Sequence, residues 1–264
     1  MTLSHDFKTM DSLSIEKIQR GLTAGSEELF QLIHDPDLEY VQILLKNHHI
    51  TEAHLLTLLK RHNLSEELIT AIYKRNKNIL SHKLVVALVK NRAISGILAR
   101  QLLPQLYLFE LVDLISLPGS TPDQKLAAER VILQRLPTTP LGNKITLARR
   151  GSATIVAALV KEGHPQILEA CLNNSHLKES AIYQFLQGTT ATAETISMIA
   201  RHNRWKQRSN LQLAILKNHK TPDIWLTLWL PRLEFHTVKI LHHLHKNSPK
   251  KKQLIAAEIA RRNR

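Results

Sequence analysis

The chain has 264 residues, of which 36 are Lys or Arg and 22 are Asp or Glu, so its formal net charge is +14. Hydrophobic residues make up 43% of it, which is enough to bury a substantial core and excludes a disordered chain. With only 8 Gly and 10 Pro, the sequence has too few turn residues for a many-stranded protein. The composition therefore predicts an all-α fold.

Cys171 is the only cysteine, which excludes an internal disulfide and a cysteine-ligated cluster. It stands in the apolar segment ILEACLNN and is predicted to be a buried, unreactive thiol. The first twenty residues lack the apolar stretch of a secretory signal, and no apolar run approaches the ~20 residues that span a bilayer. We expect a cytoplasmic protein without a transmembrane segment.

Along the chain, residues 1–24 are predicted to form a partly ordered N-terminal segment, followed by a first helical half at 25–135. Helix starts are expected at Thr51 and Ser65, because each precedes acidic residues that suit the first turn of a helix. Apolar residues then recur at helical spacing, and one such stripe is Leu55, Leu58 and Leu59.

The segment LPTTPLGN, residues 136–143, is the densest in Pro, Thr and Gly, and it is predicted to join the first half to a second half at 144–264. In the second half a helix is expected to start at Thr221-Pro222-Asp223, with Ile224 and Leu228 on its apolar stripe beside two tryptophans. A closing amphipathic helix is predicted at 250–262. The joint is expected to be a bend within one continuous superhelix.

Four apolar segments end in asparagine: VQILLKN, LVVALVKN, LEACLNN and LQLAILKN. The asparagines are Asn47, Asn91, Asn174 and Asn218. Asparagine tolerates the left-handed backbone conformation that ends many helices, so these residues are predicted to be left-handed helix caps. The implied unit is a helix, an asparagine stop, a short turn and a second capped helix.

The chain also aligns with itself without a gap when it is shifted by 127 residues, the separation of Ala87 and Ala214. Identical residues that meet in this register include Leu45/Leu172, Asn47/Asn174, Glu52/Glu179, Ile72/Ile199, Lys90/Lys217, Leu103/Leu230, Pro104/Pro231 and Pro122/Pro249. One register held over such a span indicates an internal duplication. Short helices with apolar stripes bury that surface when hairpin stacks on hairpin, so an α-solenoid is predicted.

Two segments carry a resemblance to known proteins: RLPTTPLGNKITLARRGSATIVAALVKEGHPQILEACLNNSHLKES and LAILKNHKTPDIWLTLWLPRL. They resemble bacterial HEAT-like repeat proteins of unassigned function, and the short unit is similar to the leucine-rich repeat variant. The resemblance covers most of residues 25–262 and implies a generic helical scaffold. The chain departs from the pattern, because Asn-His or Asn-Arg stands where Asn-Pro is usual and it has no cysteine cluster.

The positive charge is confined to the second copy. Residues 1–132 hold 15 basic and 15 acidic residues, which leaves 21 of the 36 basic and 7 of the 22 acidic residues in 133–264. In the duplicated register, Lys250 corresponds to Asp123 and Arg232 to Gln105, so the predicted fold does not require these bases. Self-repulsion costs stability, and the excess therefore points to an acidic partner.

The candidate polyanion-binding residues follow from this excess. They include the cluster ARHNRWKQRSN, the helix end LARRGS and the basic start of the closing helix: Arg149, Arg150, Arg201, Arg204, Trp205, Lys206, Arg208, Lys217, Lys220, Arg232, Lys250, Lys251 and Lys252. Cations would neutralise phosphates, and an exposed Trp205 indole could stack on a base. The competing interpretation is that Trp205 packs between helices while the charges are solvated.

No phosphate-cradling glycine loop and no nucleophile elbow is present, and the fifteen histidines are not spaced with the Cys, Asp or Glu partners that a closed zinc site needs. We therefore expect no metal and no cofactor. The leading hypothesis is a non-enzymatic scaffold that binds nucleic acid or an acidic protein surface through its basic half. One alternative is a protein-interaction scaffold whose charge serves only solubility.

The second alternative is an enzyme. Some basic HEAT-like proteins are DNA glycosylases that act on alkylated bases with tryptophans and a carboxylate. Trp225, Trp229 and Asp223 supply those residue types here. The two tryptophans correspond to Leu98 and Leu102 of the first copy, which favours a core position for them.

Overall fold

The computed structural model describes residues 15–263, and these residues form helices joined by loops, without a β-strand. The prediction of an all-α fold is confirmed. Of the predicted N-terminal segment, residues 1–14 lie outside the described part, and residues 15–23 are helical.

The chain divides into two compact units, which we call unit 1 (Met1–Ile132) and unit 2 (Leu133–Arg264). After the helix at 15–23, the elements of unit 1 are α2 (Ser26–Leu32), α3 (Leu38–Leu44), α4 (Glu52–Leu58), α5 (Glu66–Asn76), α6 (His82–Lys90), α7 (Gly96–Leu102), η1 (Leu103–Gln105) and α8 (Leu108–Ser116). Helix α9 (Pro122–Arg135) follows and runs past the boundary between the units.

The elements of unit 2 are η2 (Leu136–Thr138), α10 (Leu141–Arg150), α11 (Ala153–Val160), α12 (Pro165–Leu172), α13 (Glu179–Gln187), α14 (Ala193–Arg201), α15 (Ser209–Lys217), α16 (Asp223–Trp229), η3 (Leu230–Arg232), α17 (Phe235–Leu244) and α18 (Pro249–Arg262). The segment 136–143, predicted as a joint, thus holds a 3₁₀ turn and the start of α10. The predicted closing helix is α18.

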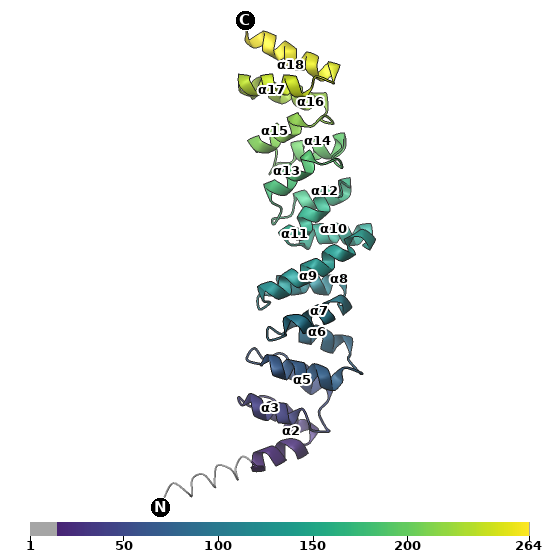
Figure 1. The fold of residues 1–264 in the computed structure, drawn as a ribbon, viewed down its shortest axis with the longest axis vertical. Coiled ribbons are helices and arrows are strands. Elements are labelled where there is room, and N and C mark those ends of the chain that lie inside the picture. Colours follow the sequence, from purple (N-terminus) through teal and green to yellow (C-terminus); the bar gives the residue numbers. More distant parts are fainter. Residues whose placement is uncertain (1–14, 264) are drawn as a thin grey trace, which may run out of the picture. The chain divides into compact units, whose positions relative to one another are not determined.

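Helices pack in two alternating series within each unit. In unit 2, α10 contacts α12 and α12 contacts α14, while α11 contacts α13, α13 contacts α15 and α15 contacts α17. Consecutive helices of unit 2 therefore follow one another through space as they do in sequence (Figure 1). In unit 1 the same alternation joins α2 to α4, α4 to α6 and α3 to α5.

Helices of unit 2 begin at a constant distance from helices of unit 1. Helix α2 begins at Ser26 and α11 at Ala153, which is 127 residues later, and the same offset separates α3 from α12, α4 from α13, α5 from α14 and α6 from α15. It also separates both ends of α7 from those of α16, of η1 from those of η3 and of α9 from those of α18. We call residues 127 positions apart counterparts.

The predicted helix starts are present where local capping chemistry dictates them. Thr51 precedes α4, and its side chain and that of His54 satisfy each other's backbone amides in a capping box. Ser65 caps α5 by accepting a hydrogen bond from the amide of Leu68. Helix α16 begins at Asp223, directly after Pro222, as predicted.

Asn47 fixes the end of one helix pair to the preceding one. Its side-chain amide donates to the carbonyl oxygens of Gly21 and Ala24, at 2.8 and 3.0 Å, and its Oδ1 accepts a hydrogen bond from the amide of His49. The carbonyl oxygens at the end of a helix have no partner within that helix, so a donor from the next repeat satisfies them. Asn47 is fully buried.

The same arrangement recurs at three further asparagines, each donating to carbonyl oxygens of an earlier segment and accepting from the amide two residues later: Asn91, Asn174 and Asn218. The predicted left-handed conformation is wrong, because no residue other than glycine has a positive φ in the described part of the chain. Asparagine is required here as a hydrogen-bonding side chain and not for its backbone freedom.

The core consists mainly of leucine, isoleucine and valine from both helix series, including the predicted stripe Leu55, Leu58 and Leu59. Cys171 is buried as predicted, and burial raises the pKa of its thiol to about 12. Helix α18 is held by Arg262, which donates to the carbonyl oxygens of Leu230 and Leu233 and also to the Glu258 carboxylate.

Candidate functional site

The division in charge coincides with the division into compact units. Unit 1 has 15 basic and 15 acidic residues, and unit 2 holds the other 21 basic and 7 acidic residues of the chain. A surface that binds an acidic partner is therefore to be sought within unit 2.

Ten of the thirteen predicted polyanion-binding residues are exposed: Arg149, Arg150, Arg201, Arg204, Lys206, Arg208, Lys217, Arg232, Lys250 and Lys252. Lys220 is half-buried, whereas Trp205 and Lys251 are buried. These residues differ in whether their side chains already have partners within unit 2.

The expectation of an exposed indole at Trp205 is wrong, because the side chain is only 3% exposed. Its Nε1 donates to the carbonyl oxygen of Leu172 at 3.1 Å. Arg204 lies over the indole ring, 4.4 Å from its centroid, and donates to the carbonyl oxygen of Asn174 at 2.7 Å. Both side chains thus fasten the loop after α14 to the end of α12, in agreement with the packing interpretation.

Lys251 is also used inside the unit. Its ammonium donates to the carbonyl oxygen of His219, and burial lowers its pKa. Its counterpart Gln124 is equally buried and donates to the carbonyl oxygens of Val89 and Asn91, both at 2.9 Å. This position requires a donor at the end of a helix, which corrects the expectation that Lys251 is surplus to the architecture.

Two further bases have partners at the surface. Lys220 donates to the carbonyl oxygen of Thr189 at 2.7 Å. Arg208 lies 3.9 Å from the Glu179 carboxylate, a loose pairing between side chains that are both partly exposed. Such contacts are weak in water, so both side chains could still turn toward an external anion.

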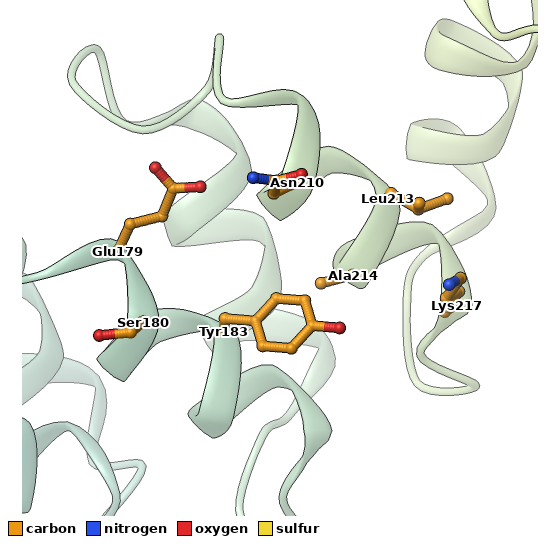
Figure 2. A pocket seen from close by; sticks show the side chains of 7 residues that line it. All are labelled: Glu179, Ser180, Tyr183, Asn210, Leu213, Ala214 and Lys217. Carbon is orange, nitrogen blue, oxygen red and sulfur yellow. The ribbon is translucent and has the colours of Figure 1, made fainter.

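A cavity of about 420 Å³ lies between α13 and α15 (Figure 2). The ring of Tyr183 lies in the middle of the labelled side chains, with Glu179 and Lys217 on opposite sides of it. A carboxylate and an ammonium both line this cavity, so their charges offset each other. It offers little net attraction to a phosphate.

A second cavity, of about 630 Å³, lies between α12 and α14. Arg201 and Arg204 line it, but so does the carboxylate of Glu169, and Arg204 is already bound to backbone carbonyls. His202 also lines it, and burial together with the nearby Arg204 lowers the pKa of its imidazole. This cavity is again mixed in charge.

A third cavity differs from these two. It has a volume of about 360 Å³, lies between the end of α14 and α16, and is lined by residues that are basic, amide-bearing or apolar: Ala200, Arg201, Lys206, Gln207, Gln212, Trp225, Leu228, Trp229 and Arg232. We call it the α14–α16 cavity. Three bases without a carboxylate among the lining residues make it the most anion-attracting of the three cavities.

The cations of this cavity are available to a ligand. Within residues 15–263, the guanidinium groups of Arg201 and Arg232 have neither a hydrogen bond nor an ion pair, and both residues are exposed. Lys206 donates to the side-chain oxygen of Asn203 at 2.8 Å, which orders its ammonium at the surface. Guanidinium groups offer several donors in a planar fork that matches a phosphate.

Trp225 and Trp229 lie mostly inside, at 8% and 6% exposure, with ring centroids 5.1 Å apart. The indole Nε1 of Trp225 donates to the hydroxyl of Ser197 at 3.1 Å. These contacts agree with the core position favoured by the sequence. The small surface that each ring leaves open belongs to the apolar wall of the α14–α16 cavity.

The expectation that Ile224 and Leu228 face the core is wrong, because they are 62% and 49% exposed. Leu228 instead lines the α14–α16 cavity, and it was not among the predicted site residues. A signal for this was present, since its counterpart in the first copy is the polar residue Gln101. Gln207 and Gln212 also line the cavity and carried no sequence signal.

Unit 1 has different side chains at the corresponding place. Ile79 stands for Lys206, Gln105 for Arg232, and Tyr73 for the small Ala200. The hydroxyl of Tyr73 accepts a hydrogen bond from the side chain of Gln101 at 2.9 Å. The basic lining and the space beside Ala200 are thus features of unit 2.

Comparison of the chain with protein-family models, with curated proteins and with solved structures finds no match. The resemblance to HEAT-like and leucine-rich repeat variant proteins therefore remains a prediction from the sequence. Among the described residues, no helix is both long enough and apolar enough to span a membrane.

Proposed function

We propose that the chain is a HEAT-like α-solenoid that arose by internal duplication, with unit 2 as the nucleic-acid-binding half of a non-enzymatic scaffold. The solenoid is supported by the alternating contacts of helices within each unit. The duplication is supported by the constant offset of 127 residues between helix starts and by the shared bonding of the four asparagines.

The observation that carries the binding function is the charge difference between counterparts. Arg232 stands where unit 1 has Gln105, and Lys206 where it has Ile79. If both units share one fold, that fold does not need the bases. Their retention on the surface, against mutual repulsion, is explained by a phosphate-bearing partner.

Helix α18 adds a second argument. Lys250 and Lys252 are exposed in its first turn, where the positive end of the helix dipole disfavours cations. The counterpart of Lys250 in α9 is Asp123, an acid that suits this position. The bases of α18 thus carry a cost in stability that binding of an acidic partner would offset.

The test is a salt titration of the full chain with a labelled 30-nucleotide strand and its duplex. Nucleic-acid binding through phosphates weakens linearly in log affinity against log salt, with a slope of roughly −0.7 to −0.9 per ion pair. Two double variants provide a matched comparison: Lys217→Gln with Lys252→Gln in unit 2, and their counterparts Lys90→Gln with Lys125→Gln in unit 1.

Both variants lose the same net charge at the same positions of the repeat. We expect the unit 2 variant to bind several-fold more weakly with a shallower slope, and the unit 1 variant to bind as the parent does. Equal losses in both would mean that only net charge matters. Absence of salt-sensitive binding in the parent would favour an interaction scaffold whose charge serves solubility.

A further inference from the structure

The α14–α16 cavity offers two kinds of surface to one ligand. Arg201, Lys206 and Arg232 supply positive charge, while Leu228 and the open parts of the two tryptophans supply an apolar wall. Leu228 is 49% exposed, so a ligand that covers it would remove apolar surface from water. A bare inorganic anion would use only the cationic part.

The size of the cavity sets a second condition. Its volume of about 360 Å³ lies at the lower end of the ~300–1,000 Å³ typical of small-molecule sites. A nucleotide has a phosphate for the cations and a base or sugar for the apolar wall. Gln207 and Gln212 add side-chain amides that can both donate and accept hydrogen bonds.

Double-stranded nucleic acid cannot present both parts at once, because its bases are stacked and paired inside the helix while its phosphates lie outside. A single strand can turn a base toward a protein while its backbone follows a basic surface. We propose that the α14–α16 cavity seats one nucleotide of a single-stranded nucleic acid, with its phosphate on Arg201 and Arg232 and its base or sugar on Leu228. This inference rests on the proposed function and specifies the form of the partner.

The experiment uses the full chain and follows tryptophan fluorescence, because Trp225 and Trp229 line the cavity. The probes are a ten-nucleotide single strand of DNA, the same length of RNA, a ten-base-pair duplex and inorganic phosphate. Two variants place the counterpart residue of unit 1 into the cavity, Arg232→Gln and Leu228→Gln. Arg149→Gln removes one exposed positive charge from α10, away from the cavity lining, as the matched control.

We expect single strands to bind more tightly than the duplex and to change the fluorescence. Arg232→Gln should weaken single-strand binding by roughly tenfold, as loss of a charge-assisted bidentate contact does, and Leu228→Gln by a few-fold. Both should leave duplex binding within about twofold. Arg149→Gln should weaken single-strand and duplex binding to the same small extent.

Three results would overturn the proposal while leaving nucleic-acid binding intact: duplex binding at least as tight as single-strand binding, equal effects of Arg232→Gln and Arg149→Gln, or no effect of Leu228→Gln. A fluorescence change with inorganic phosphate as large as that with the strands would also overturn it, because the apolar wall would then be unused. Absence of binding by any nucleic acid would instead overturn the proposed function itself.

Discussion

Unit 1 and unit 2 share helix spacing, capping and asparagine contacts, but they differ in surface charge and in the residues around the end of their fifth counterpart helix. The place between α14 and α16 is a basic cavity beside Ala200, whereas the corresponding place in unit 1 carries Tyr73, Ile79 and Gln105. The comparison teaches that positions holding the helices together are kept in both units, while positions that only face solvent are free to acquire bases.

The comparison also separates bases by their use. Lys251 and Gln124 differ in charge but both donate to carbonyl oxygens at the end of a helix. Arg232 and Gln105 differ in charge at positions without such a duty. A base in unit 2 is therefore evidence for a partner only when its side chain has no structural bond to make.

The largest expected effect concerns the asparagines that both units share. Asn47→Ala and Asn174→Ala each remove several buried hydrogen bonds and leave backbone groups unpaired, so each should lower the free energy of unfolding by about 2–3 kcal/mol in urea titrations. Asn173→Ala is the control, because Asn173 is exposed and bonds only to Glu169 and His202 near the surface. A loss at one site alone would show that the two units do not depend on this contact equally.

The next effect should distinguish the last helices of the two units, α18 and α9. Hydrogen bonds from Arg261 and Arg262 lower the pKa of the Glu258 carboxyl to about 2, whereas the counterpart of Glu258 in α9 is Val131. Because the folded pKa lies below the ordinary value of 4.5, this stabilisation is complete above pH 4.5 and is lost as the pH falls toward 2.

Hydrogen-exchange protection factors measured at several pH values between 5 and 2 provide the readout. Amides of α18 should lose protection as the pH falls, and Glu258→Gln should lack most of that change. Equal loss of protection in α9 would place the acid sensitivity elsewhere in the chain.

The smallest effect concerns the helix dipole. Lys250→Asp should raise the free energy of unfolding by about 0.5–1 kcal/mol, because an acid replaces a base in the first turn of α18. The reciprocal change Asp123→Lys in α9 should lower it by a similar amount. Denaturant unfolding of both variants at low salt measures the pair, and high salt should shrink both changes.

Much of the fold could be predicted from local sequence signals. The start of α4 at Glu52 and of α5 at Glu66 follows from capping by Thr51 and Ser65, since a cap involves residues only a few positions apart. The burial of Leu55 and Leu58 follows from helical spacing. The repeated asparagines were correctly identified as landmarks, but their conformation was not, because their partners lie 23 to 32 residues away.

The candidate site was only partly predictable. The bases Arg201, Lys206 and Arg232 were predicted from charge, but nothing in the sequence indicated that they line one cavity. The sequence could not show that Trp205 and Lys251 are buried, because their exposure depends on how a loop packs against an earlier helix.

By itself, the sequence determined the helical fold class, the starts of helices and the concentration of positive charge in the second half, since each depends on composition or on neighbours along the chain. Only the tertiary structure decided which bases are occupied by backbone carbonyls and which surround the α14–α16 cavity. The physical reason is that hydrogen bonding and burial of a side chain depend on groups brought close by packing between helices, and those groups lie far away along the chain.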